Sequence, residues 1–277
     1  MQNFHRNERE ARAVAMSIAG SDPGGGAGLQ ADLKTFAAFR VHGFSVITAV
    51  IAQNSRAVAA VQPVAPAMVA RQIEALSAER RPDALKTGAL ADAAIVRAVA
   101  RAIVRVKLPA PVVDPVFVSS AGVRLLEPAG ERALAKTLLP LARIVTPNLH
   151  EAEALARIEI DGPEAARAAA RTIFRMGPRA VLIKGGHPPR KSAPTRKLVD
   201  LLFDGRGFTE YDVRRIPGDG AHGTGCAFSA AIAASLARGM TLDEAIRAAQ
   251  RYLTRALRGA YRLSAAGRPL LDHLVRP

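Results

Sequence analysis

The chain has 277 residues, a length that α/β folds often build around one sheet, so we expect a single domain. Hydrophobic residues make up 49% of the chain and aromatic residues only 4%, which requires a core built mainly from Ala, Val, Leu and Ile. The formal charge of +15 comes from 39 Lys and Arg residues against 24 Asp and Glu residues. These basic residues are spread over nearly every expected helix without an RNA-binding or helix-turn-helix signature, which favours a solvated surface over a nucleic-acid site.

One cysteine, Cys226, excludes an intramolecular disulfide and a multi-cysteine metal site. The longest uncharged apolar stretch, residues 227–237, is too short to cross a bilayer, and charged residues near the N-terminus replace the apolar core of a signal peptide. We therefore expect a cytoplasmic protein without a membrane segment. Residues 1–12 are predicted to be a disordered leader, and residues 13–277 one domain.

Strand and helix patterns alternate along the first two thirds of the chain. A strand at residues 13–19 leads through a glycine-rich turn, residues 20–28, into a helix at residues 29–39. The next expected elements are an apolar run at 45–52, a helix from Pro66, a strand at 84–86, a helix at 92–106, and strands at 112–114, 143–146 and 180–184. This alternation predicts a mostly parallel sheet covered by helices on both faces.

The last third of the chain departs from this alternation. Residues 188–196 contain three prolines and several basic residues, which indicates a surface loop, either a plain connection or a lid. Residues 198–203 and 208–213 are predicted to form a hairpin through residues 204–207. A second glycine-rich turn, residues 218–225, opens an apolar helix at 226–237, and another helix follows at 242–257.

The two glycine-rich turns are candidate anion sites. Neither a P-loop nor the G-x-G-x-x-G spacing is present, but both turns precede helices, whose first amides have no intrahelical partner. The second turn, His222-Gly223-Thr224-Gly225-Cys226, is the sharper signal because its small residues let a phosphate approach the backbone. Taken alone, such a turn is more often an ordinary glycine turn. We expect both turns at the same edge of the sheet, because ligands in open α/β sheets bind beyond the carboxyl ends of the strands.

Further segments add to these turns in a fixed order and spacing: Ile18-Ala19-Gly20-Ser21-Asp22-Pro23, residues 25–36, 45–49 and 52–54, Asp114-Pro115-Val116, Thr146-Pro147-Asn148 with Glu151, and Lys184-Gly185-Gly186-His187. Together they resemble the hydroxymethylpyrimidine/phosphomethylpyrimidine kinase family over about residues 13–257. The resemblance implies a three-layer α/β/α ribokinase-like fold, with residues 13–277 as one kinase domain. It also implies ATP with Mg²⁺ as phosphoryl donor. The substrate would be 4-amino-5-hydroxymethyl-2-methylpyrimidine of thiamine biosynthesis, phosphorylated first to the monophosphate and then, at the same site, to the diphosphate.

The resemblance places the pyrimidine against Gly20, Asp32, Gln53 and Val116. A glutamine amide suits an aminopyrimidine, because it offers a donor and an acceptor to a ring edge that has both. For Gln53 the alternative is a polar residue that merely closes a strand.

In the family, Asn148 and Glu151 support the Mg²⁺ and phosphate region, often through water, as expected for an ion that retains water. The same spacing also fits an N-cap Asn followed by Glu in a capping box, and both interpretations can hold together. Lys184, at the end of a predicted strand, corresponds to the family's phosphate-facing lysine, although a lysine at a strand end is often only solvated.

The resemblance assigns ATP phosphates to Lys184 and to Gly223, Thr224 and Gly225. Cys226 takes the place of the aspartate base of related sugar kinases, and at a helix N-terminus we expect its pKa to be lowered. Its alternative role is a small thiol that fits the turn. In either case, phosphoryl transfer depends mainly on positioning and on electrostatic stabilisation by Lys184, Mg²⁺ and the amides of this turn.

Three departures from the family pattern leave other functions open. Ala89 replaces a common methionine, Ser120 a common lysine, and residues 219–221 a common polar triplet. A pyridoxal or pyridoxine kinase is the nearest alternative. A pyrimidine-binding sensor or a basic nucleic-acid partner is the non-enzyme alternative. We expect a homodimer that acts on a small molecule and binds neither nucleic acid nor membranes.

Overall fold

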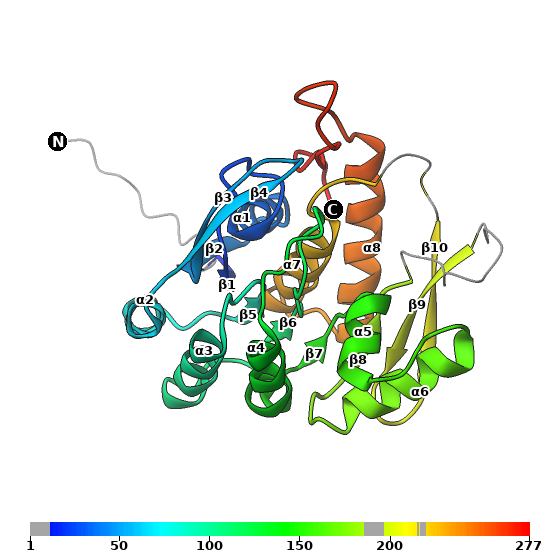
Figure 1. The fold of residues 1–277 in the computed structure, drawn as a ribbon, viewed down its shortest axis with the longest axis horizontal. Helices are drawn as coiled ribbons and strands as arrows, with labels where there is room; N and C mark the ends of the chain where they lie inside the picture. Colours follow the sequence, from blue (N-terminus) through cyan, green and yellow to red (C-terminus); the bar gives the residue numbers. More distant parts are fainter. Residues whose placement is uncertain (1–11, 186–196, 215, 217–219) are drawn as a thin grey trace, which may run out of the picture.

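The computed structural model describes residues 12–185, 197–214, 216 and 220–277. Within them, eight strands form one sheet in the order β10-β9-β8-β7-β6-β5-β1-β2 (Figure 1). Its strands are β1 Val14–Ala19, β2 His42–Ile47, β5 Ala84–Thr87, β6 Val112–Val113, β7 Ile144–Val145, β8 Val181–Ile183, β9 Lys197–Phe203 and β10 Phe208–Arg214. The six strands β2, β1, β5, β6, β7 and β8 run parallel to one another, and β9 and β10 form an antiparallel hairpin at one edge of the sheet. The mostly parallel sheet and the hairpin are as predicted.

Helices cover both faces of this sheet and give three layers (Figure 1). Helices α1, α7 and α8 pack on one face, and the remaining helices pack on the other. Their bounds are α1 Gly28–Ala38, α2 Pro66–Glu79, α3 Ala93–Arg105, α4 Pro128–Ala133, the π-helical η1 Leu134–Leu138, the 3₁₀ η2 Leu139–Leu141, α5 Leu149–Ala156, α6 Pro163–Phe174, α7 Thr224–Ala237 and α8 Leu242–Arg258.

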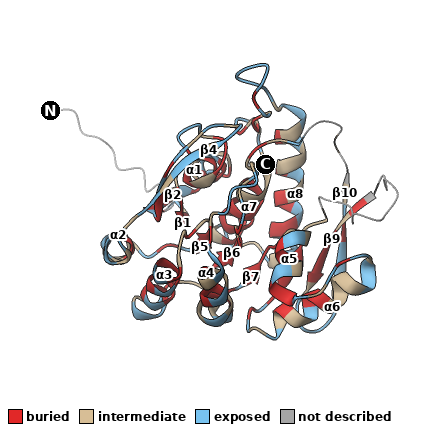
Figure 2. Ribbon diagram, viewed as in Figure 1, coloured by how far each residue is buried: buried red, intermediate tan, exposed pale blue. Residues whose placement is uncertain are grey.

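Strand alternation and side-chain size decide how these layers pack. In β1, Met16 and Ile18 join the core beneath α2 and α3, while Ala15 faces the core beneath α1 and α7. Residues 227–236 of α7 are all buried, because their mostly small side chains let the helix lie against the sheet between α1 and α8 (Figure 2). The N-terminus of α7 therefore has a fixed position over the sheet.

The apolar run at residues 45–52, expected as one element, is divided between two sheets. Its first part ends β2, and its second part belongs to β3 (Ala49–Gln53), which pairs with β4 (Val58–Pro63) in a separate two-stranded ribbon. The buried Thr48 makes the break, because its amide donates to the carbonyl of Ala19 and so turns the chain across the end of β1. A continuous apolar run does not show such a division.

Other expectations have different outcomes. Helical structure between the strands at 112–114 and 143–146 was expected, and α4, η1 and η2 lie there. The loop at 188–196 and the leader, except Arg12, lie outside the described residues. Of the residues that the structure describes, no helix is long and apolar enough to cross a membrane.

The site lies where the chain changes direction within the sheet. From β1 the chain continues to β2 on one side and later returns to β5 on the other, so a crevice opens at the carboxyl ends of β1 and β5. The first glycine turn follows β1 directly. The second meets it there, because a Cβ atom on Gly223 would overlap the carbonyl oxygen of Gly26. The prediction that both turns share one edge of the sheet is confirmed.

This contact predicts that Gly223→Ala destabilises the protein more than a change in backbone conformation alone would. The φ angle of Gly223 is 85°, and that of Gly239 is 82°, but nothing lies within 4 Å of a Cβ atom at Gly239. Gly239→Ala should cost about 1–2 kcal/mol of unfolding free energy, and Gly223→Ala distinctly more. Urea unfolding of both variants measures the difference, and equal costs would contradict the contact.

Candidate active site

The first glycine turn brings a backbone amide to Cys226. The amide of Leu29 donates to the carbonyl of Gly20 at 3.0 Å, and a Cβ atom on Gly28 would crowd that same carbonyl. With φ at 55°, Gly28 directs its own amide to the sulfur of Cys226. The start of α1 and the start of α7 therefore face each other across the crevice.

The N-terminus of α7 presents amides to the same crevice. Gly223 is the N-cap residue, and the first intrahelical hydrogen bond runs from the Ala227 amide to its carbonyl at 2.9 Å. The amides of Thr224, Gly225 and Cys226 precede that bond and have no intrahelical acceptor. They form the kind of helix terminus that binds phosphate.

Lys184 lies beside this terminus. Its Nζ is 3.4 Å from where a Cβ atom of Gly225 would lie, and it donates to Oδ1 of Asp114 at 3.0 Å. Oδ2 of Asp114 accepts from Ser229 at 3.2 Å. Burial opposes the charge of Lys184, but Asp114 and Glu151 outweigh it and raise the pKa. Lys184 is therefore a fixed cation next to the amides of α7.

Asn148 and Glu151 form the capping box of α5. The amide of Glu151 donates to Asn148 at 2.9 Å, and the amide of Asn148 donates to Oε2 of Glu151 at 2.8 Å. An isolated bridge joins Asn148 to Lys184. Burial, with a contribution from Asp114, raises the pKa of Glu151 to about 7, although Lys184 opposes it.

Of the side chains around Lys184, two of the three oxygen donors could bind Mg²⁺. The carboxylates of Glu151 and Asp114 supply the oxygen ligands that Mg²⁺ prefers, whereas the amide oxygen of Asn148 already accepts the capping hydrogen bond. No group of three or more His, Cys, Asp or Glu side chains suited to a metal occurs in the described part of the chain. Any Mg²⁺ held here would keep most of its water.

Asp32 and Lys86 form a fully buried ion pair at the floor of the crevice. Lys86 Nζ and the hydroxyl of Ser17 both donate to Oδ2 of Asp32, at 2.7 and 2.5 Å. Oδ1 of Asp32 is buried, and no partner is found for it within the described residues. Burial raises the pKa of Asp32 against the attraction of Lys86.

Cys226 lies above this pair with a raised pKa. Burial of the thiol is the largest cause, the charges of Asp32 and Asp114 add to it, and Lys86 opposes it. The resulting pKa of about 11 leaves the thiol protonated at neutral pH. The expectation of a lowered pKa at this helix N-terminus is therefore wrong.

The structure brings together Gly20 and Ala89, whose side-chain carbon lies 3.7 Å from where a Cβ atom of Gly20 would be. Val116 follows β6, and its amide donates to the carbonyl of Asp114 at 2.9 Å. Gln53 ends β3, and among the described hydrogen bonds none joins its side chain to the rest of the crevice.

Sequence reasoning did not assign three charged residues to the site: Lys86, Asp114 and Asp200. Asp200 of β9 accepts from the Gly185 amide and from the Gln250 side chain, both at 2.9 Å, and so fixes the chain just after Lys184. A charged residue inside or just after a buried strand was the available signal for the first two. Asp200 carries the same signal, because it is the one charged residue within the apolar run at 198–203 of β9 and is itself buried.

The fold has three layers, with helices on both faces of one sheet. A helix N-terminus, a buried lysine and carboxylates meet at the carboxyl edge of that sheet, and this arrangement defines a ribokinase-like small-molecule kinase. A model of the family described as phosphomethylpyrimidine kinase matches residues 22–270. The chain belongs to this family, and the fold and the resemblance expected from the sequence are confirmed. The family's members are phosphotransferases.

Curated relatives agree with this assignment. The hydroxymethylpyrimidine/phosphomethylpyrimidine kinase of Rhizobium meliloti is 46% identical over 266 residues, which cover 95% of this chain and 98% of that protein. The thiamine biosynthesis bifunctional protein ThiED of Geobacter sulfurreducens is 42% identical over 272 residues. This match covers 98% of the chain but 54% of ThiED, so the chain spans about half the length of that protein.

Two solved structures show the same fold. An ADP complex of Bacillus subtilis pyridoxal kinase superposes with a TM-score of 0.85 and 34% identity, and the match covers 95% of this chain and 98% of that one. The phosphomethylpyrimidine kinase of Clostridium difficile 630 has a TM-score of 0.78 and 36% identity, with 89% of this chain and 100% of that one covered.

The buried ion pair predicts a large cost for removing one partner. Lys86→Met leaves the carboxylate of Asp32 buried without its cation, and we expect a loss of about 3–5 kcal/mol in unfolding free energy. Arg80→Met breaks a pair with Asp83 that is 39% and 40% exposed, and should cost about 0–1 kcal/mol. Urea unfolding tests both, and a small cost for Lys86→Met would show that the pair does not stabilise the floor.

Glu151 predicts a pH dependence of stability. Its folded-state pKa of about 7 exceeds the ordinary 4.5, so the folded protein retains a proton that the unfolded chain releases between these values. Its contribution to the unfolding free energy therefore falls as the pH rises from about 4.5 to 7. Glu151→Gln keeps the capping side chain and should remove this decline.

The matched control is Glu244→Gln, at the same position of the exposed capping box of α8, where the carboxylate pKa is lowered. Unfolding is measured in urea across this pH range for the wild type and both variants. If the curve of Glu151→Gln ran parallel to that of the wild type, the raised pKa would be contradicted.

Proposed function

We propose that this protein transfers phosphate from ATP to 4-amino-5-hydroxymethyl-2-methylpyrimidine, and then to the resulting monophosphate, in thiamine biosynthesis. The observation that carries the proposal is the direct contact of the two glycine turns, which places the start of α1 opposite the start of α7. One turn then holds the acceptor and the other the transferred phosphate. The names of the curated relatives support this substrate.

The unpartnered Oδ1 of Asp32 supports an aminopyrimidine as the acceptor. A buried acceptor without a donor costs free energy, and an exocyclic amino group in the crevice would supply that donor. Gly20 and Val116 border the same crevice, and the amide of Gln53 is suited to the remaining ring edge. The smaller Ala89 leaves a wider space beside Gly20 than a methionine would.

The chain's own groups orient and stabilise the phosphates. The amides of Thr224, Gly225 and Cys226 face the transferred phosphoryl group, and Lys184 neutralises its charge. Asp200 holds Lys184 in place through the Gly185 amide. When bound, Mg²⁺ would supply further neutralisation of phosphate charge, and Glu151 with Asp114 would hold its water shell. The contribution of Asn148 is the cap that orients Glu151.

Four broader features complete the proposal. Residues 13–277 form one kinase domain, the protein works in the cytoplasm, and it binds no nucleic acid. It forms a homodimer. Sedimentation at several concentrations tests the homodimer.

Pyridoxal kinase is the second candidate, because the solved structure of the Bacillus subtilis enzyme shares this fold at 34% identity. A coupled ADP-release assay with hydroxymethylpyrimidine, its phosphate and pyridoxal decides between the two. We expect turnover of the first two compounds, with a higher kcat/KM than for pyridoxal. A preference for pyridoxal would assign the second function, and absence of turnover with all three would reject both.

Cys226 provides a test of the chemical step. Because its thiol is protonated at neutral pH, Cys226→Ala should lose less than the roughly 10²–10⁴-fold that removal of a general base costs. Cys226→Asp adds a carboxylate near the phosphates, and should slow the second phosphorylation more than the first because that acceptor is already anionic. Rates for both acceptors are compared, with folding checked by thermal melting.

A loss of 10²-fold or more in a folded Cys226→Ala variant would restore the base role. Equal losses on both acceptors in Cys226→Asp would contradict the charge argument.

A further inference from the structure

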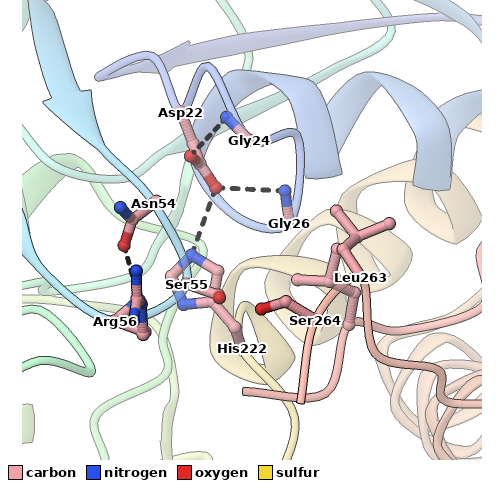
Figure 3. A pocket seen from close by; sticks show the side chains of 10 residues that line it. Asp22, Gly24, Gly26, Asn54, Ser55, Arg56, His222, Leu263 and Ser264 are labelled. Carbon is pink, nitrogen blue, oxygen red and sulfur yellow. Dashed lines mark hydrogen bonds and ion pairs between the residues drawn. The ribbon is translucent and has the colours of Figure 1, made fainter. Parts of the chain in front are cut away.

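Asp22 organises the backbone of the first glycine turn. Its Oδ1 accepts from the amide of Gly24 at 3.0 Å, and its Oδ2 accepts from the amide of Gly26 at 3.0 Å (Figure 3). The amide of Ala27 also donates to Oδ2, at 2.7 Å. Burial opposes its ionisation, but the hydrogen bond from His222 and that from Ala27 outweigh burial and lower the pKa. The turn is therefore built around one ionised carboxylate.

His222 connects this carboxylate to two other segments. Its Nε2 lies 3.1 Å from Oδ2 of Asp22, its Nδ1 lies 2.7 Å from the hydroxyl of Ser120, and its amide donates to the carbonyl of Pro269 at 2.8 Å. Because an ionised carboxylate only accepts, Nε2 carries the proton, and in the neutral ring Nδ1 accepts from Ser120. The turn after β1 and the loop after β6 thus meet at the His222 ring, and the C-terminal segment is bonded to the backbone of the same residue.

The position of His222 determines the position of the phosphate-binding terminus. His222 directly precedes Gly223, the N-cap residue of α7, so their Cα atoms are about 3.8 Å apart. Gly223 in turn packs against the carbonyl of Gly26, within the turn that Asp22 organises. A displacement of the first turn is therefore transmitted to the amides of α7.

Hydrogen bonds and packing together hold the His222 ring. The residue is buried, and its Cδ2 lies 2.8 Å from where a Cβ atom of Gly26 would be. Asp22 and His222 also line a cavity of about 250 Å³, whose other walls include Asn54 and Arg56 of the turn between β3 and β4 (Figure 3) and Leu270 of the C-terminal segment. Loss of the bond to Asp22 would leave the ring beside this cavity without its polar partner.

We propose that His222 is a positioning residue that couples binding of the pyrimidine at the first glycine turn to binding of ATP at the N-terminus of α7, through its hydrogen bonds to Asp22 and Ser120. This inference rests on the proposed function. Each ligand orders the turn that it contacts, and the linkage through His222 lets the second ligand bind to a terminus already in place.

Two substitutions of His222 separate its hydrogen bonds. A glutamine amide reaches the place of Nε2 and keeps the donor to Asp22, whereas an asparagine amide reaches the place of Nδ1 and keeps only the partner of Ser120. One control is His42→Gln, at an exposed histidine that begins β2. Ser120→Ala removes the partner of Nδ1, and Ser119→Ala at the neighbouring position is its control. All variants are first checked by thermal melting.

The first measurement needs no ligand. Amide hydrogen exchange is compared at Gly24, Gly26 and Ala27 and at the start of α7 in the full-length protein. His222→Ala and His222→Asn should raise exchange at least about tenfold in both turns, while His222→Gln and His42→Gln should not. Faster exchange in only one turn, or in neither, would overturn the linkage, whatever the outcome of the kinase assay.

The second measurement is the Kd of a non-hydrolysable ATP analogue with and without hydroxymethylpyrimidine. In the wild type the pyrimidine should tighten binding at least about fivefold, a common size of coupling. The coupling ratio is the Kd without the pyrimidine divided by the Kd with it. This ratio should fall to near one in His222→Ala and His222→Asn and persist in His222→Gln. It should decrease in Ser120→Ala but not in Ser119→Ala. An unchanged ratio in His222→Ala, or a ratio of one in a wild type that binds both ligands, would overturn the proposal.

If the wild type turns over neither acceptor, the proposed function fails, and the exchange measurement still decides whether His222 links the turns. If the wild type phosphorylates the acceptors but the pyrimidine leaves the Kd of the ATP analogue unchanged, the function stands and this inference is rejected.

Discussion

The close approach of two backbone segments, at Gly26 and Gly223, is the constraint on which the rest of the site depends. The two glycines are almost 200 residues apart in the sequence. Gly26 lies in the turn between β1 and α1, and Gly223 is the N-cap residue of α7. Any side chain at Gly223 would separate the turns and withdraw the start of α7 from the crevice. The small residues of α7 serve the same end, because they let the helix lie deep between its neighbours.

Charge compensation is the second condition that this architecture meets. Two lysines and four carboxylates are gathered at the carboxyl edge of the sheet, where each isolated charge would cost several kcal/mol. The carboxylates are those of Asp32, Asp114, Glu151 and Asp200. Lys86 is committed to Asp32, while Lys184 is shared between Asp114 and Glu151. Burial raises the pKa of Glu151, and the attraction of the shared Lys184 does not offset that burial.

Local patterns were sufficient to predict most of the elements, the mostly parallel sheet and the common edge of the two glycine turns, but not β4. They were insufficient where one pattern serves two purposes. The apolar run at 45–52 crosses from one sheet to another at Thr48, and hydrophobicity alone does not mark that crossing. The thiol of Cys226 illustrates the same limit for chemistry, because its pKa depends on burial and on carboxylates from other elements, not on the helix N-terminus alone.

The end of the chain is part of the same edge. After α8 the backbone returns through Pro269 and Leu270, which pair with His222, and continues to the buried His273, whose ring meets the hydroxyl of Tyr252 at 2.9 Å. The segment at residues 269–273 therefore braces the candidate active site. A proteolytic cut between α8 and Leu270, in a segment usually regarded as remote from function, would here act on the residue that directly precedes the N-cap of α7.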